Sequence, residues 1–518
     1  MNTPDYIFET SWEVCNRVGG IYAVLSTRAA SMQAEHPDKV FFFGPDFGAH
    51  SDIYFKENKS LLKNWLSSFD YEKSGISSVR IGRWKVPGEP IAILLKFDDL
   101  WPQKDAIYAW AWDKFQVQSH AAYGDYDESC LFGYAAGMVM ESLYHYLKTK
   151  GNRNTRSALN FCAHANEWQT AFSIFYLRDH CPKIATLFTT HATGIGRSIA
   201  GNGKPLYDYF EGYNGDQMAY ELNMVSKHSV EKQAAHWADC FTTVSDITAR
   251  ECKQLLDKPV DIVTPNGFEP TYVPKGKDFE VRREEAREAL QKVAGQLLGG
   301  VVPKNALLVG IAGRLEMKNK GIDVFASALD KLAQKIYHSD QPEREVVAFV
   351  MIPYLDRAPA RKGKVSAVFV PYYLDGHDPL FGKTYYDLLI GLDVTVFPSY
   401  YEPWGYTPLE SCAFHVPTIT TSLAGFGVWA SQQKDQYGVI VIDRNDSNFD
   451  QVAEHIADDL LRFDRLSKED KARARKEAEA VAKRADWKHF FKYYRKAYEI
   501  ALKKRDKRID ELQNPTLL

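Results

Sequence analysis

The sequence has few cysteines, no long apolar run and no excess of charge of either sign. Its seven cysteines are scattered, odd in number and never spaced as Cys-x-x-Cys, which argues against a disulfide framework and a zinc cluster. No stretch approaches the roughly 20 apolar residues that span a bilayer, and the N-terminus lacks the basic and apolar regions of an export signal. We therefore expect a cytoplasmic protein with reduced thiols and no membrane partner.

The charge balance and the length narrow the class of protein further. Lys and Arg total 64 against 67 Asp and Glu, so no overall positive field exists to hold nucleic acid. Hydrophobic residues make up 45% and charged residues 25% of the chain, which is typical of a soluble globular protein. At 518 residues the chain is too long for one ordinary core, and we expect two or three domains.

Short apolar runs rich in Val, Ile and Phe alternate with longer amphipathic stretches, a pattern that predicts βαβ units and parallel sheets covered by helices on both faces. The first series comprises residues 40–44, 91–97, 159–165, 185–192, 240–245 and 261–265, and the second comprises 307–313, 346–353, 366–373, 394–399, 418–422 and 439–443. Prolines and glycines interrupt the chain over 261–276. We therefore expect an α/β protein with two doubly wound domains, divided at 1–265 and 266–480.

Polar clusters follow several of these runs. They are HANEW (164–168), THATG (190–194), SDIT (245–248), PNG (265–267) and GRLEMKNKG (313–321). Ligands of open parallel sheets collect outside the carboxyl ends of the strands, so we expect these clusters to face one shared cleft between the domains.

The most informative segment follows a strand predicted to end near Phe397. Its loop carries Glu402, and Thr407 followed by Pro408 is typical of the N-cap and first residue of a helix. Glu410 would then occupy the third helical position. Two interpretations of Glu410 stay open, because Thr407 and Glu410 also have the spacing of a capping box.

Two further short patterns are weak by themselves. The turn from Ala424 to Gly427 has glycines that would let backbone N–H groups approach an anion, although most such pairs are ordinary loops. Asp125, Tyr126 and Asp127 could suggest an acidic metal site, but they open a predicted helix, where acidic residues are common.

The segment from Phe397 to Gly427 resembles the donor site of glycogen synthases of the fungal and animal type, retaining glucosyltransferases with the two-domain GT-B fold. Other matches occur in order along nearly the whole chain, which makes coincidence a poor explanation. They are FETSWEVCNRVGGIY (8–22), TTHATGIGR (189–197), TVSDITA (243–249), PNG (265–267), GRLEMKNKG (313–321) and ADWKHFFKYY (485–494). The resemblance also implies that helices over 481–518 return to the first domain.

The resemblance assigns roles to individual residues. It implies that Arg314 and Lys320 grip the leaving diphosphate, where preorganised cations stabilise the growing negative charge. Glu402 would lie at the sugar and Glu410 at the ribose hydroxyls. His191 would line the same cleft near the reacting glucose.

Further residues complete the site that the resemblance implies. Arg197 would lie with His191 near the phosphates, and Tyr385 would stack on the nucleotide base. Backbone of the helix start and of a glycine turn would approach the donor phosphates, through Gly405, Tyr406, Thr407, Gly19 and Gly20.

The implied partners are UDP-glucose or ADP-glucose as donor, with UDP favoured, and a glycogen or α-1,4-glucan acceptor, without a cofactor or metal. Two other functions stay open: a GT-B enzyme that makes sucrose, trehalose or a surface glycoside, and a glycan-binding scaffold without catalysis. The second is disfavoured, because a scaffold has no need of cations where a leaving group would lie.

The sequence departs from the family's pattern at three places. Asn166 stands where a second histidine is usual, so its role is left open. A long helical insertion that builds tetramers in relatives is missing after residues 351–353. Whether this protein forms a homo-oligomer is therefore left open. The arginine-rich helix for a sugar-phosphate effector is thinner, and a solvated helix face is the favoured interpretation of its residues, Lys471, Arg473, Arg475 and Lys476.

Overall fold

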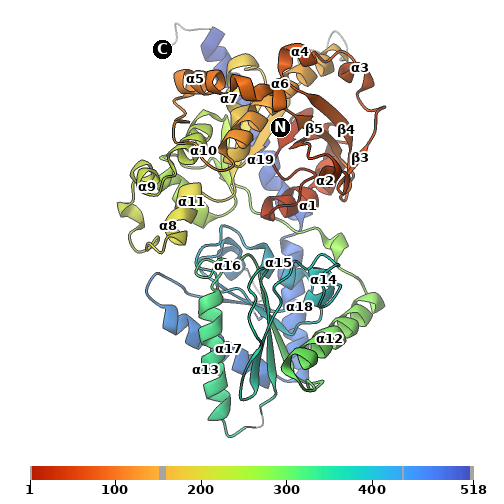
Figure 1. The fold of residues 1–518 in the computed structure, drawn as a ribbon, viewed down its shortest axis with the longest axis vertical. Helices are drawn as coiled ribbons and strands as arrows, with labels where there is room; N and C mark the ends of the chain where they lie inside the picture. Colours follow the sequence, from red (N-terminus) through yellow and green to blue (C-terminus); the bar gives the residue numbers. More distant parts are fainter. Residues whose placement is uncertain (1–2, 151–158, 342, 434–436, 514–518) are drawn as a thin grey trace. The chain divides into compact units, whose positions relative to one another are not determined.

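The computed structural model describes residues 3–150, 159–341, 343–433 and 437–513. The chain divides into two compact units, drawn in Figure 1. Unit 1 contains Met1–Ser198, Glu211–Gly267 and Trp487–Leu518, and unit 2 contains Ile199–Phe210 and Phe268–Asp486. Each unit is built around its own predominantly parallel sheet, and the units are described separately below.

The sheet of unit 1 has nine strands in the order β3-β4-β5-β2-β1-β6-β7-β8-β9. Its members are β1 (Tyr6–Thr10), β2 (Val40–Pro45), β3 (Phe55–Glu57), β4 (Ser78–Trp84), β5 (Ile91–Lys96), β6 (Phe161–Asn166), β7 (Ala185–Thr190), β8 (Cys240–Thr243) and β9 (Ile262–Val263). Pairing is parallel from β5 to β9 and antiparallel at the β3–β4–β5 edge. The central strands are buried on both faces, which explains their continuous apolar sequence.

One face of this sheet carries the main hydrophobic core, together with α6 and α7. The helices of unit 1 are α1 (Gly20–Glu35), α2 (Ala49–Asp52), α3 (Lys63–Leu66), α4 (Tyr71–Ser74), α5 (Lys104–Phe115), α6 (Tyr126–Lys150), α7 (Phe172–His180), α8 (Gly194–Gly201), α9 (Gly215–Glu221), α10 (Val225–Trp237), α11 (Asp246–Leu255) and α19 (Trp487–Gln513). The division between the units falls inside α8.

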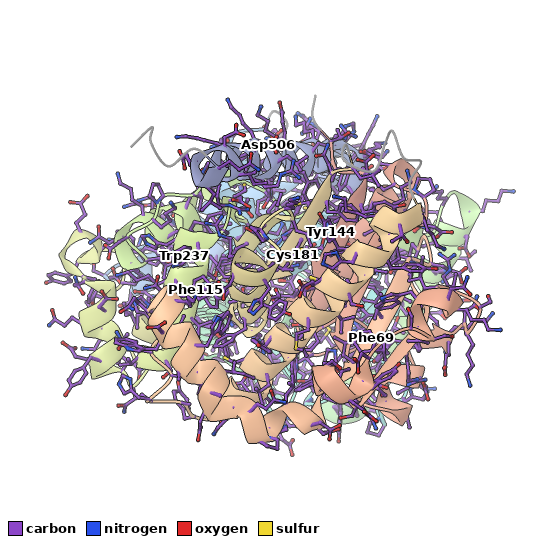
Figure 2. All side chains as sticks on the ribbon, turned by 90° about the horizontal axis from the view of Figure 1, so that it is seen from above. Phe69, Phe115, Tyr144, Cys181, Trp237 and Asp506 are labelled. Carbon is purple, nitrogen blue, oxygen red and sulfur yellow. The ribbon has the colours of Figure 1, made fainter. Side chains whose placement is uncertain are left out.

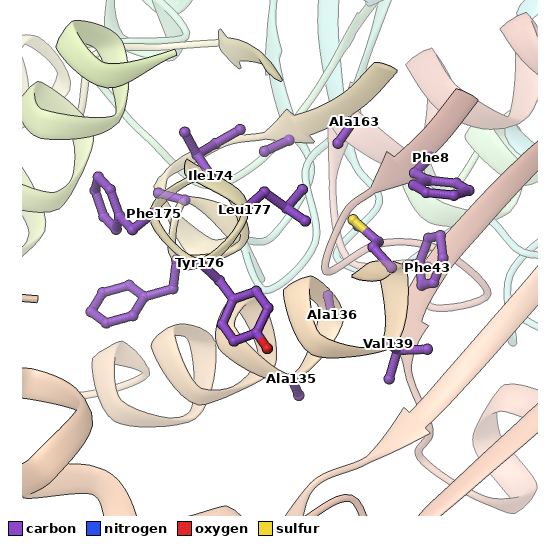
Figure 3. Packing of buried hydrophobic residues seen from close by; sticks show 14 of the residues in the cluster. Phe8, Phe43, Ala135, Ala136, Val139, Ala163, Ile174, Phe175, Tyr176 and Leu177 are labelled. Carbon is purple, nitrogen blue, oxygen red and sulfur yellow. The ribbon is translucent and has the colours of Figure 1, made fainter. Parts of the chain in front are cut away.

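Small residues let α6 and α7 pack closely in this core (Figure 3). A Cβ atom on Gly137 would lie 2.7 Å from Cβ of Tyr176, so only glycine fits at that contact. Farther along the same core, the rings of Phe115 and Trp237 meet edge to face with centroids 5.0 Å apart (Figure 2).

The opposite face of the sheet is covered by α1 and by the C-terminal helix α19. Trp487, Tyr494 and Tyr498 of α19 are buried, and the indole of Trp487 donates to the hydroxyl of Thr27 in α1 at 2.7 Å. The last helix of the chain is therefore part of unit 1. Five residues of the 481–518 segment, 514–518, lie outside the described residues.

The sheet of unit 2 has seven strands in the order β12-β13-β11-β10-β14-β15-β16. Its strands are β10 (Leu307–Ala312), β11 (Val346–Met351), β12 (Ala360–Lys362), β13 (Val365–Phe369), β14 (Val394–Val396), β15 (Thr418–Thr421) and β16 (Val439–Ile442). Its helices are α12 (Lys277–Leu298), α13 (Ile322–Tyr337), α14 (Tyr385–Leu389), α15 (Tyr406–Ala413), α16 (Gly425–Ser431), α17 (Phe449–Arg465) and α18 (Lys468–Arg484). Only the short edge strand β12 is antiparallel among the described strands of this sheet.

A short segment that precedes most of unit 2 in the chain, Ile199–Phe210, also belongs to it. The backbone N–H of Leu206 donates to the hydroxyl of Tyr400 at 3.0 Å. Those of Tyr207 and Asp208 donate to one carboxylate oxygen of Asp446 at 2.9 and 2.6 Å. These hydrogen bonds fasten the segment to the loops that follow β14 and β16.

Every apolar run chosen from the sequence forms a strand, and the α/β prediction is confirmed. Four strands were not predicted: β1, β3, β4 and β12. All seven cysteines have free, buried thiols. Among the described residues, no helix has the length and apolar character needed to cross a membrane.

Candidate active site

In unit 2, the predicted cations and the first predicted carboxylate lie at the same edge of the sheet. Arg314 and Lys320 follow β10, Glu402 follows β14, and these two strands pair in parallel. Lys320 forms a short ion pair with Glu402, and their side chains are only 19% and 15% exposed. Arg314 is more open, with 54% of its side chain exposed and its guanidinium 2.8 Å from the carboxylate of Glu316. Neighbouring carboxyl ends are where such sheets bind ligands.

Glu316 was not predicted, yet it organises this loop. Besides its ion pair with Arg314, it accepts a hydrogen bond from the side chain of Asn319 at 3.3 Å. The carbonyl of Asn319 accepts the N–H groups of Tyr400 and Tyr401 at 2.9 and 3.2 Å. The loop that carries the cations is thus joined to the loop that carries Glu402. The sequence signal was present, since Glu316 lies inside the motif that contains Arg314.

The helix after Glu402 begins earlier than predicted. α15 starts at Tyr406 with Gly405 as N-cap, so Thr407 lies inside the first turn and no side chain caps the helix. Thr407 as N-cap is therefore wrong, as is the capping box with Glu410. The physical reason is Gly405, whose φ of 109° lies in a region that favours glycine and turns the chain into the helix one residue before Tyr406.

Glu410 has a different partner from the one that the capping-box interpretation required. It is buried, and its carboxylate accepts a hydrogen bond from the hydroxyl of Tyr386 at 2.7 Å. The neighbouring Tyr385 begins α14, where Thr384 and Asp387 form a capping box. The Tyr385 hydroxyl is buried without a hydrogen-bond partner among the described residues. Tyr386 was missed because an aromatic on a short helix has an ordinary packing role.

Two N–H groups of the turn from Ala424 to Gly427 donate to backbone carbonyls of the Glu402 loop. The N–H of Gly425 donates to the carbonyl of Glu402 at 3.1 Å, and the N–H of Phe426 donates to the carbonyl of Trp404 at 2.7 Å. These groups therefore hold the loop that carries Glu402. A Cβ on Gly427 would lie 2.3 Å from the carbonyl oxygen of Thr421, so this glycine is required for packing.

In unit 1, His191 follows β7 directly and is 8% exposed. The N–H groups of His191 and Ala192 donate to one carboxylate oxygen of Glu167, at 2.7 and 3.2 Å. The imidazole Nε2 lies 3.0 Å from the amide oxygen of Asn166, which ends the neighbouring strand β6. Burial and the nearby charges of Arg28 and His164 lower the pKa of His191 to about 3, so the ring is neutral.

Two more buried carboxylates hold the rest of this turn. Glu231 accepts a short hydrogen bond from the hydroxyl of Thr190 and one from the N–H of Gly194 at 2.9 Å. Glu251 accepts the hydroxyl of Thr193 at 2.6 Å. Burial raises the pKa of Glu231 above its ordinary value, and it does the same for Glu167. This acidic cage was not predicted, because its members come from separate helices and loops.

The remaining predicted residues of unit 1 lie at two helix starts. Arg197 is half-buried in the first turns of α8. Gly19 is the N-cap of α1 and Gly20 its first residue. The N–H groups of Gly19 and Tyr22 both donate to the carboxylate of Glu13 at 2.8 Å. The Glu13 carboxylate therefore occupies N–H groups of this turn that could otherwise bind a phosphate.

The acidic residues around Tyr126 serve the start of α6, as expected. Asp127 accepts the hydroxyl of Tyr108 at 2.6 Å and pairs with Lys104 at 3.1 Å, and Asp125 pairs with Lys227 at 2.6 Å. Each carboxylate is therefore engaged by a protein donor.

A group with metal-ligand atoms lies elsewhere in unit 1. Ligand atoms of Glu141, His145 and Cys181 lie within 4.8 Å of one another. The hydroxyl of Tyr176 already donates to Glu141 at 2.7 Å, and burial raises the pKa of the Cys181 thiol to about 12. Internal contacts explain this group without an ion.

Comparison with known proteins adds sequence relatives along nearly the whole chain. A sequence model of the family described as glycogen synthase matches residues 9–359 and 355–514. Glycogen (starch) synthase isoform 2 of Saccharomyces cerevisiae is 26% identical over 621 residues, which cover 96% of this chain and 86% of the yeast protein. The liver enzyme of Homo sapiens is 25% identical, with 98% and 85% covered. The Dictyostelium discoideum enzyme is 26% identical, and the chain spans 66% of its length.

Solved structures agree on the fold. The catalytic domain of starch synthase IV from Arabidopsis thaliana, bound to ADP and acarbose, matches with a TM-score of 0.59 at 14% identity, over 96% of this chain and 99% of that one. A UDP-forming trehalose-phosphate synthase from Burkholderia vietnamiensis matches with a TM-score of 0.56 at 12% identity, over 95% and 99%. Both likenesses concern the GT-B fold. The chain belongs to the glycogen synthase family and is a glycosyltransferase.

Proposed function

We propose that the protein transfers glucose from a nucleoside diphosphate glucose, with UDP-glucose favoured, to the non-reducing end of an α-1,4-glucan with retention of configuration. One observation carries the proposal: Arg314, Lys320 and Glu402 lie together at the carboxyl ends of the paired strands β10 and β14. Family membership supports the same reaction. The relatives are named as glycogen synthases, and two solved neighbours were obtained with ADP or UDP.

The cations act on the leaving group. As the bond between glucose C1 and the phosphate oxygen breaks, negative charge grows on the departing diphosphate. The Lys320 ammonium and the Arg314 guanidinium stabilise that charge in the transition state, because both are present before the reaction begins. Lys320 is held by Glu402, and Arg314 is held by Glu316, so the free enzyme keeps each cation in place until a phosphate arrives.

The glucan hydroxyl completes the transfer. Its oxygen forms the new bond to C1 on the face that the diphosphate leaves, and its proton passes to a leaving phosphate oxygen. Glu402 is proposed to accept hydroxyl groups of the glucose, and Glu410, oriented by Tyr386, those of the ribose. Tyr385 is proposed to stack on the base. The start of α15, from Gly405 to Thr407, offers N–H groups to phosphate.

Unit 1 is proposed to contribute His191 and Arg197, with the turn at Gly19 and Gly20. The neutral imidazole of His191 suits a polyhydroxyl ligand, because it can exchange hydrogen bonds without bringing a competing positive charge. The backbone of its turn is fixed by Glu167 and Glu231. Such a fixed turn lowers the entropy that binding must overcome.

The decisive assay measures labelled glucose incorporation into glycogen with UDP-glucose and ADP-glucose side by side. We expect turnover with UDP-glucose to exceed that with ADP-glucose. Sucrose, trehalose or another small glycoside as the sole product would instead support the other GT-B functions. Absence of transfer from both donors would support the scaffold. Chelation of divalent metal should leave the rate unchanged.

Arg314→Ala tests the assignment of the leaving-group cations. We expect turnover to fall by a factor on the order of 100 or more, typical for loss of one charge-stabilising group. Arg462→Ala removes an exposed arginine that is also paired with a neighbouring carboxylate, and it should leave turnover unchanged. Glucose incorporation by Arg314→Ala near the unsubstituted level would contradict the assignment.

A sugar-phosphate effector at α18 is a second proposal, carried by Arg475. This residue is half-buried, and its guanidinium lies 5.9 Å from the centre of the Phe279 ring. Burial lowers its pKa, so a bound anion would stabilise its charged form. Its neighbours are already engaged, since Arg473 pairs with Glu477 at 2.9 Å and Lys471 donates to the carbonyl of Asp464 at 2.8 Å. A flat activity curve against added glucose 6-phosphate would exclude activation.

The compartment and the assembly belong to the proposal as well. Free, buried thiols at all seven cysteines support a reducing compartment, and we propose the cytoplasm. Determination of the solution mass would decide whether a homo-oligomer forms.

A further inference from the structure

Buried polar side chains interrupt the sheet of unit 1 on the face that α19 covers. Glu9 of β1 lies beside His164 of β6 in the strand register, and Asn166 follows two residues later on the same face. The side chains of Glu9 and His164 are fully buried, and Asn166 is 1% exposed. Burying polar groups in such positions costs stability unless hydrogen bonds satisfy them.

Glu9 is charged in this environment. Its carboxylate lies 2.5 Å from the guanidinium of Arg28, which stands 4.1 Å from the centre of the Tyr494 ring of α19. Burial raises the pKa of Glu9, but the charges of Arg28 and His164 and hydrogen bonds from His164 and Asn166 outweigh burial and lower it to about 2. A carboxylate in this state only accepts hydrogen bonds.

That charge determines which way the amide of Asn166 faces. The amide nitrogen lies 2.7 Å from the carboxylate oxygen of Glu9 and 3.2 Å from the carbonyl oxygen of Thr10, two acceptors. The reversed amide would place its oxygen against a negative charge and a carbonyl. The amide oxygen must therefore point the other way, where it lies 3.0 Å from Nε2 of His191.

The amide oxygen can only accept, so Nε2 of His191 must carry a hydrogen. Because the ring is neutral, the second nitrogen, Nδ1, then has a free lone pair. Resting on the proposed function, we propose that Asn166 is a positioning residue that fixes His191 as the Nε2–H tautomer, so that Nδ1 accepts a hydrogen bond from a sugar hydroxyl. Asn166 itself touches no substrate.

A purely structural role for Asn166 predicts something different. In that case the amide would only satisfy Glu9 and Thr10, and the tautomer of His191 would not depend on it. The protonation pattern of the His191 ring, compared with and without Asn166, therefore separates the two explanations, and it can be measured without any turnover.

Long-range proton–nitrogen NMR correlation of protein labelled with nitrogen-15 in histidine reports that pattern. The His191 signals are assigned by their loss in His191→Gln. We expect a neutral ring with the hydrogen on Nε2 from about pH 5 to about pH 8. A hydrogen on Nδ1 in the unsubstituted protein would overturn the proposal, whatever its enzymatic activity.

Asn166→Ala provides the second measurement. We expect Nδ1–H to become detectable and kcat to fall by about tenfold to a hundredfold, with a smaller change in KM, because His191 is no longer oriented. Thr189→Ala is the matched control, since Thr189 bonds His164 at 2.7 Å within the same buried network but leaves the amide–imidazole contact intact. This control should keep the tautomer.

The outcomes separate this inference from the proposed function. If Asn166→Ala shows the unsubstituted tautomer and kcat, the positioning role is wrong. If the unsubstituted protein has the Nε2–H tautomer and glycogen is not extended, the geometry stands and the reaction assignment fails. If Asn166→Ala does not fold, a hydrogen on Nδ1 of His191 in the unsubstituted protein would still overturn the inference.

Discussion

The two units hold their candidate functional groups in opposite ways. In unit 1, the turn that carries His191 is surrounded by carboxylates, two of them fully buried, that accept its N–H and hydroxyl groups. In unit 2, Arg314 is 54% exposed and each cation is paired with a carboxylate of its own or a neighbouring loop. Unit 1 therefore holds the backbone of the His191 turn in place, whereas unit 2 holds two cations in ion pairs.

This difference follows from what each group is proposed to do. An imidazole that exchanges hydrogen bonds with a sugar must have one orientation and one tautomer, which burial provides. Cations that receive a highly charged diphosphate must stay ionised, and partial exposure avoids the cost of burying them. Ion pairs in the free enzyme keep them in place meanwhile. Three experiments test this difference between the units.

The largest effect is expected when the positive charge of Lys320 in unit 2 is removed. Lys320→Met keeps the length of the side chain but removes its charge, and it leaves the carboxylate of Glu402 without this partner. We expect turnover to fall by about a thousandfold, the upper end for one preorganised charge-stabilising group. Lys335→Met on α13, a partly exposed lysine paired with Glu454 and Asp458, is the control and should retain full turnover. Equal turnover in Lys320→Met and Lys335→Met would contradict the role of the Lys320 charge.

A medium effect is expected from the carboxylates of unit 1, through pH. Burial raises the pKa of Glu167 and Glu231, so between the ordinary carboxyl value of 4.5 and those raised values the folded protein binds more protons than the unfolded chain. The free energy of unfolding should therefore fall as pH rises through neutrality, by up to about 1.4 kcal/mol per pH unit for one proton.

Glu231→Gln tests the source of that pH dependence. Its amide can still accept from Gly194 and donate to Thr190, but it has no proton to lose. Urea unfolding at about pH 6 and about pH 8 should show a smaller loss of stability in this variant. Glu454→Gln, at an exposed position, should behave like the unsubstituted protein. A Glu231→Gln slope that equals the unsubstituted slope would contradict the buried cage.

The smallest effect is expected at the nucleotide end of unit 2. Tyr386→Phe removes the hydroxyl that donates to Glu410 at 2.7 Å. A hydrogen bond to a charged carboxylate is worth about 1.5–3 kcal/mol, so KM for the donor should rise about tenfold with kcat unchanged. Tyr437→Phe, at an exposed tyrosine, should change neither constant. A fall in kcat alone would mean that Glu410 takes part in the chemical step.

The strands of the two sheets could be predicted from the sequence, because strands buried on both faces need continuous apolar runs. β1 was missed for a physical reason: its apolar stretch is short and ends in Glu9 and Thr10, which the buried network accommodates. The edge strands β3 and β12, and β4 beside β3, are less apolar and gave no signal. Domain boundaries were expected after residues 265 and 480, and the units divide after Gly267 and Asp486.

Site residues inside a sequence motif could be predicted, whereas their contacts with residues far away in the sequence could not. Lys320 and Glu402 could be named from their motifs, but their ion pair joins loops 82 residues apart. The start of α15 was misplaced because Thr407 and Pro408 suit a helix start equally well, and the positive φ of Gly405 decided the matter. Glu167 lies in the polar cluster 164–168, but its contact with the His191 turn was not predicted, and Glu231 and Glu251 gave no local signal, because only the packed sheet brings all three to one turn.

The two α/β sheets and the motifs that carry the cations could be recognised without the structure, since both depend on residues close together in the chain. The folded structure was needed to show which carboxylate faces which cation, how the amide of Asn166 turns, and which residues of α19 contact α1. Those outcomes depend on contacts between distant segments, such as Glu9 with Asn166 and Trp487 with Thr27. Hydrogen-bond direction and burial are properties of the folded chain, because they exist only when all partners are in place.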